Sequence, residues 1–207
     1  MDRMPEPGLC DASESMIEDV DFARAREYAL LATLLWRSPD AELIARLALL
    51  RDDASPLGRA HAALAEAAIT ATAQSTQAEY FQLFEGVGRS QILPYASFYL
   101  TGSLHGRPLV RLRETLKRLG IERAEDHSEP EDHAAFLCEI MACLVGGQIN
   151  APAEAEREIF ERHVAPWIGR FLADLEHAES AGFYARVGAL GLTFIRIESE
   201  AFKFAST

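Results

Sequence analysis

Residues 129–144 read EPEDHAAFLCEIMACL, an acidic stretch with one proline and one histidine that runs directly into an apolar segment. Proline has no amide hydrogen and suits the first turn of a helix, so Pro130 predicts a helix start with Glu129 or Ser128 as the cap. The apolar residues that follow recur at spacings of three and four, which continues the predicted helix to Leu144.

The same acidic stretch has two interpretations. Ser128 and Glu131 have the spacing of a capping box, and acids suit the positive end of the helix dipole. Capping leaves His133 unexplained. On a helix, Glu129 lies three residues from Asp132 and four from His133, so these side chains can share one face. The residues alone leave open whether that face is functional.

Helical spacing recurs along the whole chain, and alternating patterns rich in Val, Ile and Thr, which are typical of strands, are absent. We therefore expect an all-α fold, a helical bundle of about ten helices. Prolines, glycines and capping acids delimit the predicted helices, at 19–37, 40–50, 56–73, 79–85, 94–100, 109–119, 134–144, 152–163, 166–177 and 183–201.

A polar, acidic segment divides these helices into two groups. We expect residues 1–18 to form a disordered tail, because they mix acids, prolines and small residues without an apolar stretch. The remainder is predicted to be one helical domain with an N-terminal group at 19–120, a connector or hinge at 121–133 and a C-terminal group at 134–207. The residues assigned to the hinge are Ser128, Pro130 and Glu131.

Composition narrows the class of protein. The 207 residues suffice for one domain with a real core, and 32 acids against 20 Lys and Arg give a net charge of -12, which argues against nucleic-acid binding. Cys10, Cys138 and Cys143 form neither a disulfide framework nor a zinc motif, as expected in a reducing cytoplasm. We find no signal peptide and no apolar run long enough for a membrane span. The sequence therefore predicts a soluble cytoplasmic protein.

Catalytic and cofactor motifs are weak. No serine or cysteine follows the pattern of a nucleophile elbow, and the glycine pair at 86–88 lacks the lysine and strand of a phosphate-binding loop. A metal-dependent helical enzyme with a site built from His127, Glu131 and His133 is an alternative, although His127 precedes the proline and has no fixed relation to His133. We expect no catalytic residue, no metal and no cofactor.

Aromatic residues cluster around the glycine pair. Most of them are predicted to lie in the core, but tyrosines beside carboxylates on a concave helical face would form a peptide groove. The cluster consists of Tyr80, Phe81, Phe84, Tyr95, Phe98 and Tyr99.

Taken in order, these motifs resemble the TorD/DmsD family of cytoplasmic chaperones for molybdenum-containing redox enzymes. Residues 80–84 with Gly86 are similar to the family's tyrosine and Leu-Phe-x-Gly segment, and residues 94–99 resemble its proline-aromatic helix. Residues 129–133 match its Glu-Pro-x-Asp-His signature, while Ala96 stands where relatives often carry a larger or acidic residue. Further landmarks are Met141, Leu144, Gly147, His163, Pro166, Trp167, Phe171, Phe183 and Tyr184.

The resemblance covers roughly residues 21–201 and implies a TorD-like fold in which the two helical groups are joined by a hinge at the signature. Some members exchange these groups between subunits, so a homodimer stays open. The family binds the twin-arginine leader of a precursor enzyme. By that likeness the chain would bind the leader and apo form of a molybdoenzyme, of the formate dehydrogenase or S-/N-oxide reductase type, assist cofactor insertion and delay export without catalysing a reaction.

Carried over by position, Asp132 and His133 are the residues expected to recognise the leader, with Glu129 in support and Tyr95 and Ser97 lining the neighbouring groove. The carboxylates suit the arginines of a leader, and His133 could tune binding near neutral pH. A different hypothesis is a scaffold for a folded redox-enzyme subunit that does not read the leader.

Overall fold

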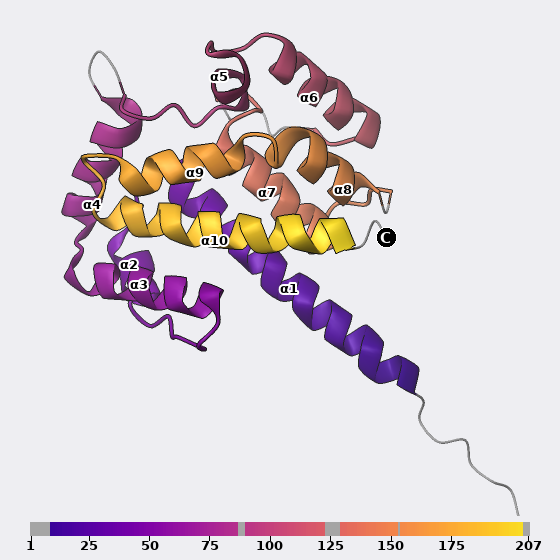
Figure 1. Ribbon diagram of the computed structural model, residues 1–207, viewed down its shortest axis with the longest axis horizontal. Helices are drawn as coiled ribbons and strands as arrows, with labels where there is room; N and C mark the ends of the chain where they lie inside the picture. Colours follow the sequence, from indigo (N-terminus) through magenta and orange to yellow (C-terminus); the bar gives the residue numbers. More distant parts are fainter. Residues whose placement is uncertain (1–8, 87–89, 123–128, 153, 205–207) are drawn as a thin grey trace, which may run out of the picture.

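The computed structural model describes residues 9–86, 90–122, 129–152 and 154–204, with side chains from residue 19 onward (Figure 1). These residues form α-helices, two short π-helical turns and one isolated β-bridge, which confirms the all-α fold. The elements are α1 (Leu9–Trp36), α2 (Ala41–Leu47), α3 (Pro56–Thr70), α4 (Ala73–Tyr80), η1 (Phe81–Glu85), α5 (Ala96–Thr101), α6 (Arg107–Leu119), α7 (Ala134–Val145), α8 (Ala155–Ile159), η2 (Phe160–Val164), α9 (Ile168–His177) and α10 (Phe183–Phe204).

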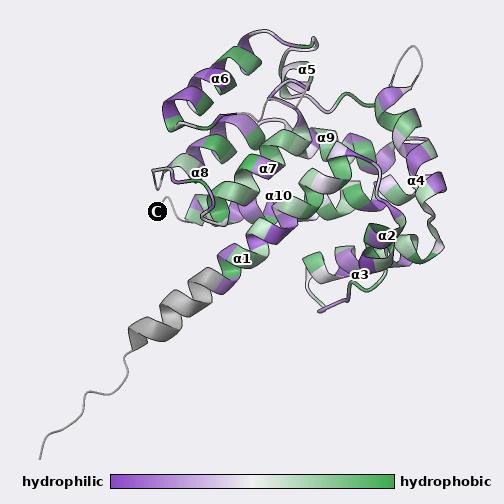
Figure 2. Ribbon diagram, turned by 180° about the vertical axis from the view of Figure 1, so that it is seen from behind, coloured by the Kyte–Doolittle hydropathy of each residue, from purple (hydrophilic) through white to green (hydrophobic). Residues whose placement is uncertain are grey.

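Two helix pairs carry most of the packing. α1 lies along α7, and α9 lies along α10, which also packs on α3 and α4 (Figure 1). The apolar residues of both groups belong to one core, in which Tyr28, Leu64, Trp167 and Tyr184 are all at most 1% exposed. In Figure 2, α6 alternates hydrophilic and hydrophobic residues, in keeping with a helix that covers the core with one face.

A close approach of backbones brings α9 and α10 together. A Cβ added at Gly188 would lie 2.6 Å from the backbone nitrogen of Glu176 and 2.8 Å from the carbonyl oxygen of Leu172. Because backbone atoms cannot move aside as a side-chain end can, only glycine permits this crossing.

Two polar contacts join elements that are far apart in sequence. The Arg24 guanidinium binds the buried Glu198 carboxylate at 2.8 Å and Glu156 at 2.5 Å, which ties α1 to α10 and α8. Glu79 of α4 accepts hydrogen bonds from the backbone nitrogens of Gly182 and Tyr184, at 2.8 and 2.6 Å, and so caps the start of α10.

Several helix boundaries differ from the prediction, most clearly at α1, α4 and α7. α1 begins at Leu9 rather than at residue 19, so residues 9–18 are helical and not part of a disordered tail as predicted, since they are mostly compatible with a helix. α4 includes the polar residues 74–77 that were predicted to interrupt a helix, because Thr72 and Ser75 form a capping box there. α7 covers the apolar segment predicted at 134–144, but Pro130 does not form its first turn, because the helix begins at Ala134. No described helix has the length and apolar character needed to cross a membrane.

Candidate functional site

The signature segment pairs with the proline-aromatic segment through the backbone. The Ala96 nitrogen donates to the Asp132 carbonyl at 2.9 Å, and the Ala134 nitrogen donates to the Pro94 carbonyl at 2.8 Å. These bonds flank a single β-bridge between Tyr95 and His133. The start of α5 and the start of α7, which are 38 residues apart in sequence (Ala96 and Ala134), are therefore fixed side by side.

Asp132 closes the start of α5. Its Oδ2 atom accepts a hydrogen bond from the Ser97 backbone nitrogen in the first turn of α5, at 2.8 Å. The N-cap residue of that helix, Tyr95, provides no side-chain hydrogen bond of its own. Asp132 is 1% exposed and its Oδ1 atom has no hydrogen-bond partner among the described residues. Ser97 is fully buried, and its hydroxyl accepts from the His105 backbone nitrogen at 3.0 Å. The Asp132 carboxylate therefore caps the N-terminus of α5, although it comes from a distant part of the chain.

His133 is the N-cap of α7, a role the sequence assigned to Glu129 or Ser128. Its Nδ1 atom accepts a hydrogen bond from the Ala135 backbone nitrogen at 3.1 Å. The ring lies edge-on to Tyr95 and Trp36, with centroids 5.1 and 5.5 Å away. Burial lowers the pKa of His133 to about 4, against the opposing effect of the Glu129 and Asp132 carboxylates. The imidazole is therefore neutral near pH 7 and serves as an acceptor.

The helix starts later than predicted for a physical reason. The Ala134 nitrogen is bonded to the Pro94 carbonyl, and the His133 nitrogen closes a turn onto the Pro130 carbonyl at 3.1 Å. Residues 130–133 form this turn instead of a first helical turn. Ser128, half of the predicted capping box, lies outside the described residues, and Glu131 forms an ion pair with Arg113 at 2.8 Å.

Glu129 and Tyr95 form the half-buried edge of the site. The Tyr95 hydroxyl donates a hydrogen bond to the Glu129 carboxylate. Burial, with a further contribution from this carboxylate, raises the pKa of Tyr95 well above its usual range. The structure thus brings together all five residues predicted to bind a peptide: Tyr95, Ser97, Glu129, Asp132 and His133.

A cavity of about 780 Å³ lies on the tyrosine side of the site. Its lining includes Tyr80, the 43% exposed Phe81, and three exposed charged residues, the carboxylates Asp40 and Glu85 and the guanidinium of Arg37. Burial raises the pKa of Tyr80, and the charges of Glu85 and Glu129 add to the rise. The cavity combines one tyrosine ring and a phenylalanine with carboxylates, and none of the five predicted site residues lines it, so the peptide groove stays a prediction.

A second cavity, of about 910 Å³, includes Asp132 in its lining on the α6 side. Its charged residues are mixed but include four arginines, Arg107, Arg111, Arg118 and Arg162. The two cavities therefore differ in the charge that they present around the signature.

Sequence reasoning missed Trp36, Asp40 and Glu85 as residues of this region. Trp36 ends an apolar helix and looked like core, and Asp40 looked like a cap, which it also is, since it accepts from the Leu43 nitrogen at 2.8 Å. Glu85 directly follows the Leu-Phe pair of the aromatic segment, and this position could have indicated that its carboxylate lies near the site. None of the three carries a motif of its own.

The aromatic cluster is divided between two places. Tyr80 and Phe84 pack against Tyr184 of α10, at 5.7 and 5.6 Å between centroids. Tyr99 instead packs on Trp167 of α9 at 5.6 Å. Only Tyr80, Phe81 and Tyr95 therefore contribute to the surface near the signature.

Metal ligation was the alternative for the acidic segment. Within the ranges that the structure describes, no three His, Cys, Asp or Glu side chains lie close enough to bind a metal ion. His127 lies outside those ranges, so the set His127, Glu131 and His133 stays a hypothesis. Of its described members, Glu131 is held by Arg113 and the His133 ring is packed between two aromatic rings.

A family model described as nitrate reductase delta subunit matches residues 50–173, more than half of the chain. The chain belongs to this family. Among curated proteins it is similar to the chaperone protein TorD of Vibrio cholerae, with 29% identity over 128 residues that cover 58% of each chain. It is also similar to the TorD chaperone of Aliivibrio fischeri, with 28% identity over 131 residues that cover 58% of this chain and 61% of the relative. The resemblance to the TorD/DmsD family is confirmed.

The alignments span about three fifths of the curated relatives, 58% and 61% of their length. Those relatives bear the name of a chaperone and not of an enzyme, in agreement with the prediction that the chain catalyses no reaction. The crystal structure of an Archaeoglobus fulgidus protein described as a redox enzyme maturation protein has the same fold, with a TM-score of 0.55, 16% identity and coverage of 94% of this chain and 98% of that one.

Proposed function

We propose that this protein is a cytoplasmic chaperone that binds the twin-arginine leader and the apo form of a molybdoenzyme, assists cofactor insertion and delays export. The observation that carries the proposal is the convergence of the five site residues, of which Tyr95 and Glu129 interact electrostatically with Tyr80 in the lining of a cavity that also presents Phe81 and two carboxylates. The chaperone names of the relatives support it.

The leader contacts are assigned to the edge of the site. Glu129 and Glu85 both act on the pKa of Tyr80, and a carboxylate can accept several hydrogen bonds, so the two residues offer acceptors to guanidinium groups. The cavity on the α6 side carries four arginines beside three carboxylates, so it is less suited to such a peptide. The apolar part of the leader is expected to contact Phe81 and the tyrosine rings.

Asp132 and His133 are assigned an indirect part. Both are almost fully buried, at 1% and 5% exposure, and each uses its side chain to hold the start of a helix. They position Tyr95 and Glu129 relative to α1 and α7. In this role they determine the shape of the leader site without touching the leader.

Leader affinity tests the proposal. Titration calorimetry with a leader peptide from a formate dehydrogenase, nitrate reductase or S-/N-oxide reductase precursor should show at least about tenfold weaker binding to Glu129→Gln and Glu85→Gln, since each loses a charged acceptor. Glu114→Gln, an exposed substitution in the cavity on the α6 side, should bind as the parent does. A peptide with both arginines replaced by lysine should bind more weakly to the parent, because lysine cannot form the bidentate pair.

The result that would overturn leader recognition is equal capture of the precursor with and without its leader. That outcome would instead favour a scaffold that binds a folded subunit. Unchanged affinity in both glutamine variants would place the leader elsewhere on the molecule.

A further inference from the structure

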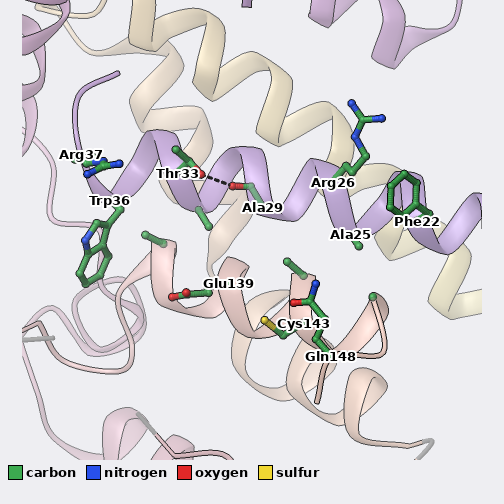
Figure 3. Close-up of a pocket in the computed structure, with 14 residues that line it drawn as sticks. Phe22, Ala25, Arg26, Ala29, Thr33, Trp36, Arg37, Glu139, Cys143 and Gln148 are labelled. Carbon is green, nitrogen blue, oxygen red and sulfur yellow. Dashed lines mark hydrogen bonds between the residues drawn. The ribbon is translucent and has the colours of Figure 1, made fainter. Parts of the chain in front are cut away.

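A groove runs along the seam between α1 and α7. It encloses about 510 Å³ and is lined mainly by small residues, among them Ala25, Ala29 and Gly146 (Figure 3). Small side chains leave room for the backbone of another helix to approach closely. Along α1 the groove extends from Phe22 to Trp36, which is about 21 Å of helix. Its length and lining therefore suit a helix.

The two ends of the groove carry aromatic and cationic side chains. Phe22 and Arg26 lie at one end, and Trp36 and Arg37 lie at the other (Figure 3). Phe22 is 64% exposed, and the guanidinium carbon of Arg26 lies 5.8 Å from the centroid of its ring. Aromatic residues and arginine are enriched in protein interfaces, where they anchor the partner. The groove therefore has the composition of a protein-binding surface.

The two helices that form the groove run antiparallel. A Cβ added at Gly146 would lie 3.5 Å from the Ala25 Cβ, and the ring centroid of His133 lies 5.5 Å from that of Trp36. Interpolation between these two contacts places Glu139 of α7 about midway along the groove, where Figure 3 also shows it.

Three charges in the groove are available to a partner. Arg26, Arg37 and Glu139 are exposed, and they form no ion pair within the part of the chain that the structure describes. The two arginines are eleven residues apart, which places them on the same side of α1 at a separation of about 16 Å. The groove thus presents positive charge at both ends of its α1 wall and negative charge in the middle of its α7 wall.

We propose that this groove binds an amphipathic helix of a partner protein. The helix carries two acids at the spacing of Arg26 and Arg37 on the flank that faces α1, and a lysine or arginine halfway between them on the flank that faces α7. Its apolar face packs on the small residues of the groove, as in other helix-in-groove complexes. The acids pair with the two arginines and the base pairs with Glu139, so the charges determine the register of the bound helix.

Charge distinguishes this partner from two other occupants. A twin-arginine leader would bring its arginines towards Arg26 and Arg37, and like charges disfavour such a contact. No helix among the described elements of this chain has two acids eleven positions apart, so a second copy lacks the matching pattern. Of the described residues, Arg37 alone lines both this groove and the cavity on the tyrosine side of the leader site, so the experiments use Arg26 and Ala29.

Fluorescence anisotropy with a labelled, alanine-rich helical peptide of this charge pattern tests the proposal. The full chain should bind the peptide, and Arg26→Glu should weaken binding at least about tenfold at low salt, where exposed charges are least screened. Two further peptides each carry lysine in place of one acid, and one of them should recover most of the affinity for Arg26→Glu, because the charge pair is reversed rather than removed. Arg51→Glu, on an exposed loop outside the groove, is the matched control and should bind as the parent does.

Filling the groove tests its shape independently of charge. Ala29 is exposed and lines the groove, so Ala29→Trp should weaken peptide binding at least about tenfold by occupying the space of the helix. Ala23 is also exposed on α1 but does not line the groove, and Ala23→Trp should bind as the parent does. Circular dichroism of each variant establishes that it is folded.

A parent protein that does not bind the patterned peptide would overturn the proposal, and so would equal binding of a peptide with the same residues in scrambled order. Unchanged affinity in both Arg26→Glu and Ala29→Trp would do the same. Displacement of the peptide by a twin-arginine leader would assign the groove to the leader instead, and a parent dimer in sedimentation velocity that Ala29→Trp dissociates would assign it to a second copy. Neither residue lines the cavity on the tyrosine side, so leader titration of both variants should match the parent, and the groove and the leader site can fail separately.

Discussion

At the scale of single residues, the most informative side chain is His133, because its cap and its burial both require a neutral ring. Nδ1 accepts from the Ala135 nitrogen, so protonation of that atom would remove the cap and place a charge between Trp36 and Tyr95. The nearby carboxylates of Glu129 and Asp132 favour the charged form but do not outweigh burial. An acidic pH should therefore act against the folded state here.

The pH dependence has a definite sign. The folded pKa of about 4 lies below the ordinary value of 6.5, so the unfolded chain binds the proton first and the free energy of unfolding falls as pH drops from 6.5 towards 4. The contribution of His133 amounts to about 3 kcal/mol at most. Urea unfolding at pH 7 and pH 5 should show a smaller decrease in His133→Asn, which keeps a capping side chain, than in the parent.

His61 changes the free energy of unfolding with pH in the opposite direction. Its Nε2 atom lies 2.8 Å from Glu27 Oε1, and this bond raises the pKa of His61. A raised pKa contributes stability below the unfolded value that is lost as pH increases through the folded one. The contribution of His61 is the same in the parent and in His133→Asn, so it cancels when the two proteins are compared. An identical pH dependence in both proteins would contradict the prediction for His133.

Glu79 caps α10 from another helix, and its removal should weaken the fold. Glu79→Ala leaves the backbone nitrogens of Gly182, Phe183 and Tyr184 without this acceptor, at an expected cost of about 1–2 kcal/mol in the free energy of unfolding. Glu79→Gln should lose less, since its amide oxygen still accepts. Glu66→Ala, an exposed substitution on α3, is the control, and an equal loss in both alanine variants would exclude a capping role.

At the scale of elements, the crossing of α9 and α10 depends on one glycine. Gly188→Ala puts a methyl group against the backbone of α9, so it should lower the free energy of unfolding by about 1–3 kcal/mol. Gly169→Ala is the matched control, because its nearest neighbour is a Leu192 side-chain carbon at 4.0 Å and alanine favours a helix. Thermal unfolding of both variants checks this, and a neutral Gly188→Ala would mean that the helices can separate without cost.

Helix types and approximate positions could be predicted from sequence, whereas the start of α7 could not. The signals from Pro130 and from the capping box concern only neighbouring residues. The backbone nitrogens of Ala134 and Ala96 instead donate to carbonyls of the proline-aromatic segment and of the signature segment, respectively. A pairing between residues so far apart leaves no trace in spacing or composition. The same limit concealed Trp36, which looked like an ordinary core residue until His133 was placed against it.

At the scale of the whole molecule, the order of motifs predicted the family and the gathering of the five site residues. The burial of Asp132 and His133 was not predictable, because acids and histidines near a helix start are usually exposed. Nor does the sequence show that the two predicted groups share one core. That follows from α1 lying on α7 and from α10 lying on α3, contacts between distant parts of the chain.

The shared core predicts how the molecule unfolds. Each predicted group contains one tryptophan, Trp36 in α1 and Trp167 in α9, and Trp36→Phe or Trp167→Phe leaves a single probe in the other group. Because the long helices pack across the groups, opening one exposes the apolar face of the other, so both should unfold together. Urea transitions followed by tryptophan fluorescence in the two variants should each coincide with the transition in far-ultraviolet circular dichroism of the same variant. Fluorescence midpoints that depart from the helical signal would show that the groups are separate cooperative units, and would favour an exchange of whole groups between subunits.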